Sequence, residues 1–192
     1  LIKFIIVMVL LLLVFGGGTK LVVAGGAKSL DMADRWLGSG GGARLLLADQ
    51  PYGNGPRQSL DIWVPENAQQ GDALPVVVFF YGGGWDSGER ASYGFAGRAL
   101  AQQGFVVVIP DYRLTPKAHW PDFLEDSAAA VAWTHRYIGG LAGDPERIAL
   151  MGHSAGAYNA VMLALDPTWL RGAKSDPSVI RGVAGLAGPY DF

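Results

Sequence analysis

Residues 148–165 read IALMGHSAGAYNAVMLAL, and this stretch decides the fold of the chain. Its first part, Ile148–Met151, is a short, continuous apolar run, which is typical of a strand that is buried on both faces. Its last part, Ala155–Leu165, predicts a helix, and the Asp-Pro pair directly after it is a stop signal. The junction has the pattern G-x-S-x-G around Ser154, which between a strand and a helix predicts a sharp turn with an exposed serine hydroxyl.

The turn needs a glycine on either side of this serine for a steric reason. Gly152 and Gly156 lack the side chains that would collide with the neighbouring strand and helix in so tight a turn. The turn leaves the Ser154 hydroxyl at the carboxyl edge of the sheet. There the N-terminus of the next helix points its N–H groups and its dipole toward any negative charge that develops. The motif therefore predicts that Ser154 is a catalytic nucleophile.

The rest of the chain alternates between strands and helices. Further apolar runs without alternation predict other strands buried on both faces, and two earlier segments joined by a turn of Pro, Gly and Asn predict an antiparallel pair. This order indicates an α/β fold with a mostly parallel sheet and helices on both faces. The predicted strands are 44–49, 58–64, 76–80, 105–109, 148–151 and 183–186, and the predicted helices are 92–103, 122–138 and 155–165.

A second motif, Tyr81-Gly82-Gly83-Gly84-Trp85, directly follows the predicted strand 76–80. Glycines let the main chain approach a ligand and aim N–H groups at it, which is what the oxyanion formed in acyl transfer needs. Such a donor loop is expected ahead of the serine turn, as it is here. A flexible loop without function is the alternative. A phosphate loop is a poorer interpretation, because no GK[ST] follows the glycines, and the dinucleotide fingerprint G-x-G-x-x-G does not occur at the loop.

From residue 43 to residue 192 the chain resembles the α/β-hydrolase superfamily, in particular esterases and lipases with an HGGG-like oxyanion loop of the carboxylesterase and arylformamidase-like branch. Four segments carry the resemblance: the glycine loop, the serine turn, DYRL at 111–114 and AGPYDF at 187–192. The resemblance implies that Ser154 is the nucleophile and that the backbone N–H groups of Gly83, Gly84 and Ala155 form the oxyanion hole. Tyr81 stands where the family has a histidine that holds the loop by hydrogen bonds.

The base that a catalytic serine needs does not follow it in the chain. Carboxylates do follow it, but Asp166 and Asp176 are interpreted as a helix stop and a surface loop, and the family takes its acid from a later strand than the one that ends before Asp191. The expected order is Ser, then Asp or Glu, then His, yet all the histidines precede Ser154. We expect the His153 side chain to turn away from the hydroxyl and His135 to be a packing or surface residue. The expected order of the catalytic residues argues against a catalytic role for His119. The fold is therefore expected to be incomplete at the C-terminus, with the catalytic Asp and His beyond Phe192. The 192-residue chain alone is expected to have little or no esterase activity.

The expected function is hydrolysis of carboxylic esters through an acyl-enzyme, with a small-molecule acyl ester as substrate and with no metal or organic cofactor. Trp85 and Tyr112 are candidates for lining the substrate pocket, although large aromatic residues are more often part of the core. Three alternatives stay open. They are a formamidase or a peptidase on the same scaffold, since the fold does not fix the substrate, and a non-catalytic binding protein that has lost the base. The oligomeric state is not predicted.

Residues 1–27 are predicted to be a signal peptide or a membrane anchor. Phe4–Phe15 is an unbroken apolar run of signal-peptide length behind Lys3, and small residues follow it. The protein is thus expected to be exported, to a periplasm or to the medium, or to be membrane-anchored with membrane contact through residues 2–24. A buried core element is the alternative. Residues 28–42, rich in Gly, Ser and Asp, are predicted to be a linker to the hydrolase-like domain.

The composition excludes several classes of protein. Half of the residues are hydrophobic, 17% are charged, the formal net charge is −2, and there is no cysteine. A disordered chain would be less hydrophobic or more highly charged, and a disulfide framework or a cysteine-ligated metal site needs cysteine. A nucleic-acid-binding domain has a basic surface, and a formal net charge of −2 does not indicate one. We therefore expect a globular domain with no nucleic-acid partner.

Overall fold

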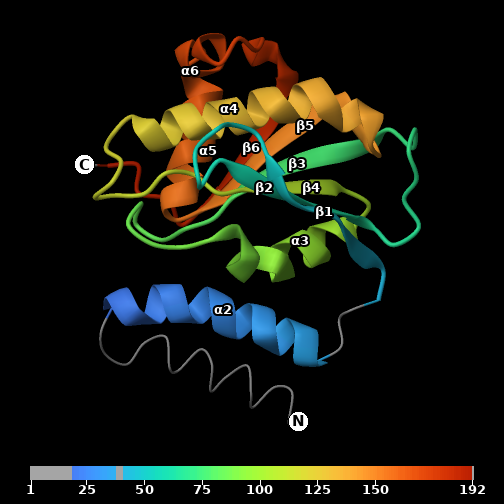
Figure 1. The fold of residues 1–192 in the computed structure, drawn as a ribbon, viewed down its shortest axis with the longest axis horizontal. Helices are drawn as coiled ribbons and strands as arrows, with labels where there is room; N and C mark the ends of the chain where they lie inside the picture. The colour runs from blue at the N-terminus through green and yellow to red at the C-terminus, as the bar shows by residue number, and fades with distance from the viewer. Residues whose placement is uncertain (1–18, 38–40, 192) are drawn as a thin grey trace.

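The computed structural model describes residues 19–37 and 41–191 and arranges six strands in one sheet of order β1-β2-β4-β3-β5-β6 (Figure 1). The pairs β1–β2 and β2–β4 are antiparallel, and the pairs β4–β3, β3–β5 and β5–β6 are parallel. This confirms the predicted antiparallel pair and the parallel strands that follow it. The strands are β1 (Ala43–Pro51), β2 (Ser59–Pro65), β3 (Leu74–Phe80), β4 (Val106–Pro110), β5 (Gly143–His153) and β6 (Ile180–Leu186).

Helices lie on both faces of the sheet, as the sequence predicts (Figure 1). The helices α4, α5 and α6 are on one side, α3 is on the other, and α2 lies outside α3 (Figure 1). The predicted helix at 92–103 is divided into a 3-10 turn, Arg90–Tyr93, and α3. The helices are α2 (Thr19–Leu37), α3 (Gly94–Ala101), α4 (Asp122–Tyr137), α5 (Ala155–Leu165) and α6 (Thr168–Gly172), with further 3-10 turns at Ile138–Gly140 and Pro177–Val179.

The central strand β3 is buried on both faces, which explains its continuous apolar sequence. Val76, Val78 and Phe80 pack into the core that includes residues of α4 and α5. Val77 and Phe79 pack into the core that includes residues of α3. Because side chains alternate in direction along a strand, a strand covered on both faces must be apolar at every position. The end of β3 is thus fixed rigidly at the edge of the sheet where the glycine loop begins.

The last strand, β6, differs from the prediction that it is buried on both faces. It is the outermost strand of the sheet, and Val183 and Leu186 are 43% and 46% exposed. Within the described residues, α5 packs against it on one side. A continuous apolar run shows that its side chains favour burial, but it does not show which neighbour covers them. The prediction of burial on both faces is therefore wrong for this strand.

The predicted linker over 28–42 is wrong for residues 28–37, because they belong to α2. The physical reason is a buried arginine on α3. The Arg98 guanidinium donates to Asp31 of α2 (Nη2 to Oδ1, 2.7 Å) and to Asp34 of α2 (Nε to Oδ2, 2.5 Å). It also lies over the ring of Trp63, 5.3 Å from its centroid. The two aspartates therefore neutralise a charge that would destabilise the fold if it were buried alone.

The predicted signal peptide or anchor at 1–27 and the predicted membrane contact at 2–24 fall largely on residues 1–18, which lie outside the described part of the chain. The helix α2 starts at Thr19 and runs through the predicted boundary at residue 27, so that boundary does not coincide with the end of an element. Among residues 19–37 and 41–191, no helix combines the length and the apolar character that a membrane crossing requires.

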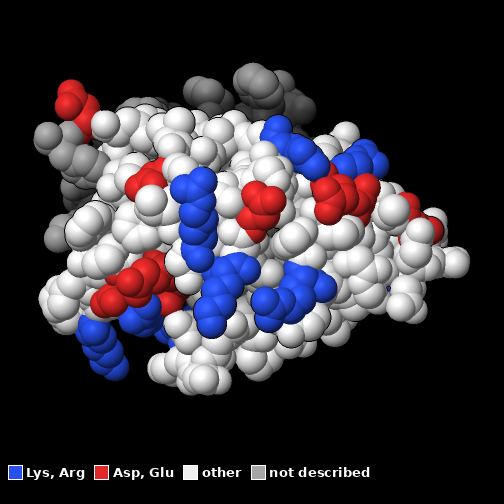
Figure 2. Space-filling view, turned by 90° about the horizontal axis from the view of Figure 1, so that it is seen from above, with Lys and Arg blue, Asp and Glu red and all other residues white. Residues whose placement is uncertain are grey.

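Basic and acidic side chains lie side by side on the face of the molecule that is seen from above (Figure 2). One group of ion pairs ties the segment after β4 to α4. Arg113 pairs with Asp122 (3.1 Å), Glu125 (3.5 Å) and Asp126 (2.8 Å). Asp126 is almost fully buried and also accepts a hydrogen bond from the side-chain amide of Gln58 (2.7 Å). The DYRL segment thus has a structural part in fixing this connection.

Candidate active site

Ser154 lies in the tight turn between β5 and α5, as the sequence predicts. Its backbone angles are φ 53° and ψ −122°, a conformation that strains any residue with a Cβ atom. The turn is held on both sides. The Ser154 N–H donates to the carbonyl of Leu186 at the end of β6 (2.8 Å), and its carbonyl accepts from the N–H of Ala157 in α5 (2.9 Å). Strained residues of this kind persist only where their surroundings fix them, and they concentrate at functional sites.

The two glycines of the motif occupy positions where no side chain fits. A Cβ atom on Gly152 would lie 2.1 Å from the carbonyl oxygen of Gly156. A Cβ atom on Gly156 would lie 2.2 Å from the carbonyl oxygen of Phe80 and 2.4 Å from that of Tyr81. The first turn of α5 therefore packs directly on the backbone at the end of β3. This confirms the predicted steric reason for the motif.

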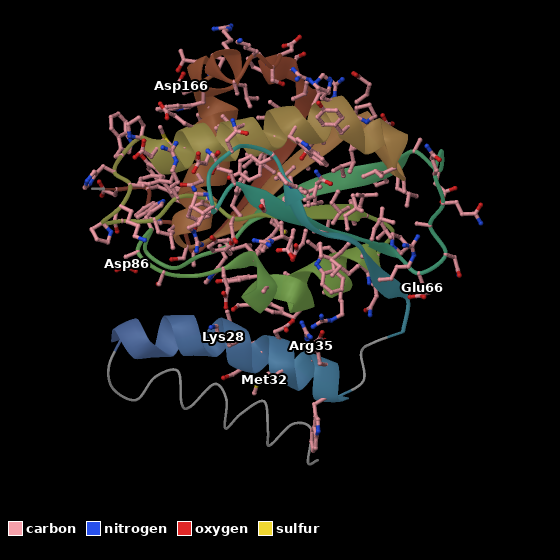
Figure 3. The ribbon with its side chains drawn as sticks, in the orientation of Figure 1. Lys28, Met32, Arg35, Glu66, Asp86 and Asp166 are labelled. Atoms are coloured by element: carbon pink, nitrogen blue, oxygen red, sulfur yellow. The ribbon has the colours of Figure 1, made fainter. Side chains whose placement is uncertain are left out.

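The predicted motif at 81–85 belongs to a longer loop, residues 81–88, which follows β3 and touches the serine turn and is the glycine loop of the structure. A Cβ atom on Gly82 would lie 2.9 Å from the Cβ atom of Ser154, so the two segments are in van der Waals contact. Figure 3 labels Asp86 of this loop at the left side of the molecule, the side on which Figure 1 marks the C-terminus after β6. The loop and the serine thus meet at the edge where the parallel strands end.

The three predicted N–H donors lie in the two segments that meet here, the glycine loop and the first turn of α5, and their role as an oxyanion hole stays a prediction. Gly83 and Gly84 lie in the loop with φ 147° and 61°, values that favour glycine. The Gly83 carbonyl accepts from the N–H groups of Asp86 (3.2 Å) and Ser87 (3.0 Å), which folds the loop on itself. Ala155 is the first residue of α5. Because N–H groups in the first turn have no acceptor within their helix, the Ala155 N–H is suited to binding an anionic oxygen.

Trp85, predicted to line a substrate pocket, joins the glycine loop to α5. Its indole N–H donates to the side-chain oxygen of buried Asn159 (3.0 Å). Its ring stacks on Phe123, with centroids 5.3 Å apart, and meets Tyr158 edge-on at 5.4 Å. The Trp85 carbonyl accepts from the N–H of Thr115 (2.8 Å). The half-buried ring therefore holds the loop, and its contact with substrate stays a prediction.

Tyr112 is the predicted pocket residue that the structure contradicts. Its side chain is fully buried at 0% exposure, so it cannot line a pocket that a substrate enters. It stacks on Tyr81, with ring centroids 4.6 Å apart, and its hydroxyl donates to the Tyr81 carbonyl (2.6 Å). Aromatic size alone does not distinguish a core position from a pocket wall. Tyr112 supports the glycine loop from the core.

Sequence reasoning missed the polar residues that hold the loop. Arg57, in the turn before β2, donates to the hydroxyl of Tyr81 (2.6 Å). Asp111, which directly follows β4, accepts from the backbone N–H of Arg90 (2.8 Å). Arg57 belongs to no motif, and its partner lies 24 positions away in the chain. The one available signal was Tyr81 itself, which replaces the histidine of the family and needs a different partner.

Within the described part of the chain, no histidine forms a hydrogen bond with Ser154. The Nδ1 atom of His153 faces the hydroxyl of Tyr93 (3.3 Å), so the ring turns away from the serine as expected. The Nε2 atom of His135, a half-buried side chain, lies 3.9 Å from a carboxylate oxygen of the exposed Glu146. Neither ring is placed to act as the base.

His153 gives the fold a dependence on pH. Burial lowers the pKa of its imidazole below the usual 6.5, because desolvation disfavours the charged form. The Tyr93 oxygen already accepts the N–H of Gly82 (3.2 Å), so the Tyr93 proton is available to Nδ1 of a neutral His153. Since the pKa is lower in the folded state, the unfolded chain binds more protons as the pH falls. The free energy of unfolding should therefore be at its full value above pH 6.5 and decrease below it.

Urea unfolding of the whole protein at about pH 7.5 and about pH 5.5 measures this effect. The matched variant is His153→Gln, whose side-chain amide keeps a hydrogen-bond acceptor but does not titrate. The difference in free energy of unfolding between the two pH values should be smaller in the variant. An equal difference in both proteins would contradict the role assigned to His153.

The chain is similar to esterases in sequence. The BD-FAE family model matches residues 60–192. The chain is 35% identical over 154 residues to a probable isoprenylcysteine alpha-carbonyl methylesterase of Oryza sativa subsp. japonica, covering 78% of this chain and 37% of that protein. It is 37% identical over 147 residues to the esterase LipC of Mycobacterium tuberculosis, covering 73% of this chain and 36% of that protein. The chain thus spans about a third of the length of the curated relatives it matches.

Solved structures share the arrangement of sheet and helices. The apo form of Thermogutta terrifontis esterase 2 superposes with a TM-score of 0.55 at 28% identity, over 64% of this chain and 46% of that one. Esterase B from Lactobacillus rhamnosis superposes with a TM-score of 0.66 over 81% of this chain and 52% of that one. The second match, at 22% identity, bears on the fold alone.

Proposed function

The chain belongs to the BD-FAE family and has the predicted α/β-hydrolase fold of esterases and lipases, and on this premise we propose that the whole protein hydrolyses carboxylic esters of small molecules. Ser154 is the proposed nucleophile. The observation that carries the proposal is the contact between Gly82 of the glycine loop and Ser154 on its strained turn. It brings the serine turn into contact with the loop that carries two of the proposed N–H donors, which supports a site for acyl transfer.

The reaction begins when the Ser154 oxygen attacks the ester carbonyl carbon and the carbonyl oxygen becomes an oxyanion. The N–H groups of Gly83, Gly84 and Ala155 bind this oxyanion, and the dipole of α5 adds to their effect. Collapse of the intermediate breaks the C–O bond of the ester, the leaving oxygen takes up the proton that Ser154 gave to the base and departs as the alcohol, and the acyl group stays on Ser154. Water then releases the acid. Each such donor contributes about 10²–10³-fold to kcat in hydrolases of this kind.

The attacking hydroxyl must lose its proton to a base. His153 faces Tyr93, and His135 faces Glu146, so neither serves Ser154. No hydrogen bond joins the His119 side chain to Ser154 within the described residues either, so the proposal takes the base, and an acid that orients it, from outside them.

The relatives support ester substrates, and the ligands of one solved structure support short acyl chains. The curated relatives are named as esterases or as a methylesterase. The Thermogutta terrifontis esterase, 28% identical to this chain, has been solved with butyrate and with propionate bound. We therefore take short-chain acyl esters as the proposed substrate class, with formamides and peptides as the alternatives that the test includes.

The test uses the whole protein, p-nitrophenyl acetate and butyrate as substrates, and paraoxon as a reagent that phosphorylates activated serines. We expect both esters to be hydrolysed and paraoxon to place a diethylphosphoryl group on the tryptic peptide 148–171, at Ser154. An adduct at another residue would remove Ser154 from the mechanism. Turnover of a formanilide or of a peptide anilide in place of the esters would reassign the substrate class. The absence of both turnover and adduct would indicate a binding protein.

Export or membrane anchoring is a further part of this proposal. Its support is the apolar segment Phe4–Phe15 behind Lys3. Fractionation of cells that express the whole protein should find it outside the cytoplasm, and recovery from the cytoplasmic fraction would contradict this.

A further inference from the structure

One arginine, Arg57, links the two ends of the glycine loop. A single nitrogen of Arg57, Nη2, donates to the hydroxyl of Tyr81 (2.6 Å) and to the carbonyl of Gly88 (2.8 Å). These are the first and the last residues of the loop. The Nε atom donates to the carbonyl of Tyr112 (2.9 Å), the residue that stacks on Tyr81. One side chain thus joins both ends of the loop to the segment that follows β4.

The two ends of the loop are in contact at this point. A Cβ atom on Gly88 would lie 2.7 Å from the carbonyl oxygen of Gly82 and 2.9 Å from the ring of Tyr81. Gly88 has φ 101°, a conformation that favours glycine. Because the ends touch, a shift of either one moves the other. The displacement then reaches Gly83 and Gly84, which directly follow Gly82 in the chain.

The Tyr81 hydroxyl is well suited to accept this hydrogen bond. Burial, together with the nearby negative charge of Asp111, raises the pKa of Tyr81 well above its usual value, so the hydroxyl stays neutral. Its oxygen therefore remains an acceptor for the guanidinium. The positive charge of Arg57 is balanced by Asp111, 3.5 Å away, which also pairs with Arg90. A partly buried cation needs such a partner, and the arrangement supplies one.

We propose that Arg57 is a positioning residue of the oxyanion hole. It acts through Tyr81 and Gly88, holding the loop so that the N–H groups of Gly83 and Gly84 point at the reacting carbonyl. The proposal rests on the proposed function, which gives the loop that role. Arginine suits the task because its planar fork fixes the direction of several hydrogen bonds, whereas lysine offers a point charge. Since the donors bind the oxyanion more strongly than the ground state, their displacement should lower kcat and leave KM nearly unchanged.

The first arm of the experiment is kinetic and uses the whole protein with p-nitrophenyl butyrate. Arg57→Ala is expected to lower kcat by about 10²-fold with KM within about twofold, because a displacement of about 1 Å in a catalytic group has an effect of that size. Arg57→Lys should fall between the native protein and Arg57→Ala. Added methylguanidine should restore part of kcat in Arg57→Ala and leave the native protein unaffected.

The control variant is Arg44→Ala. Arg44 also donates to two backbone carbonyls, those of Glu66 (3.1 Å) and Ala68 (2.9 Å). Glu66 lies at the opposite side of the molecule from Asp86 of the glycine loop (Figure 3). The variant therefore removes an arginine and its two hydrogen bonds to backbone carbonyls far from the serine, and its kcat should equal the native value.

The second arm is hydrogen–deuterium exchange, which does not depend on activity. Uptake in peptides that cover 81–88 should rise in Arg57→Ala and in Arg57→Lys, while uptake in β3 and α5 stays at the native level. An unchanged kcat in both variants, or unchanged uptake at 81–88, overturns the proposal. The proposal is also overturned if kcat falls and deuterium uptake rises throughout the chain in both variants, because the loss is then one of global stability. If the native protein hydrolyses no ester, the proposed function fails, and the exchange arm alone decides whether Arg57 holds the loop.

Discussion

A Ser154→Gly variant of the whole protein is expected to lose ester hydrolysis and to gain stability. The hydroxyl is the proposed nucleophile, and loss of a catalytic serine lowers kcat by about 10⁶-fold in a hydrolase of this mechanism. The residue has φ 53° and ψ −122°, where a Cβ atom introduces strain of about 1–3 kcal/mol. Glycine removes that strain but has more freedom in the unfolded chain. The net rise in the free energy of unfolding should be about 1 kcal/mol.

The Ser154→Ala variant separates the two effects. It removes the hydroxyl but keeps the Cβ atom, so it should be as inactive as Ser154→Gly and stay within about 0.5 kcal/mol of the native stability. Urea unfolding and initial rates of butyrate ester hydrolysis are measured for all three proteins. Equal stability of the glycine and alanine variants would show that the turn is not strained. Activity retained by either variant would show that another group is the nucleophile.

A Gly156→Ala variant is expected to lose more than about 4 kcal/mol of stability, together with all activity. The added methyl group would lie 2.2 Å from the carbonyl oxygen of Phe80 and 2.4 Å from that of Tyr81. Both atoms belong to the backbone at the end of β3, which is buried on both faces and cannot give way. The alternative is for α5 to move outward, which displaces Ser154 and the N–H of Ala155. Either movement disrupts the core and the site together.

The matched control is Gly172→Ala. Gly172 is the last residue of the short helix α6, and a Cβ atom there meets no atom within 4 Å. This variant should be neutral or stabilised by up to about 1 kcal/mol, because alanine has less freedom in the unfolded chain. The measurement is the urea unfolding midpoint, with the yield of soluble protein as the second readout should Gly156→Ala fail to fold. A native midpoint for Gly156→Ala would contradict the packing of α5 on β3.

The parts of the site that could be predicted from the sequence are those with local causes. The turn at Ser154 is recognisable because its steric demand is met by the glycines two residues before and after it. The strands β3 and β4 and the apolar part of β5, residues 148–151, are recognisable because burial on both faces favours continuous apolar sequence. The first residues of β5, 143–147, could not be predicted because they are mostly polar. The positions of Gly83 and Gly84 follow from the strand before them. In each case the neighbours in sequence are also the neighbours in space.

The parts that could not be predicted have partners far away in the chain. Asp31 belongs to a helix rather than a linker because Arg98, 67 positions later, needs a carboxylate. Tyr112 belongs to the core because Tyr81 stacks on it, and no local pattern shows that contact. The sequence of β6 is an apolar run, but whether other elements bury both faces of the strand depends on which elements lie next to it. Side-chain type indicates what a residue needs, and only the assembled fold shows what supplies it.

The pairing of β3 with β5 has a consequence for how this site can vary among related chains. Phe80 lies opposite Gly152 in the parallel ladder, so the glycine loop and the serine turn start from adjacent positions. Their separation is therefore set by hydrogen bonds across the sheet and not by the chain that connects them. Insertions or deletions between α4 and β5 leave both halves of the site in place. The connecting segments can therefore differ in length among related chains, while the distance between the glycine loop and the serine turn at the sheet edge stays the same.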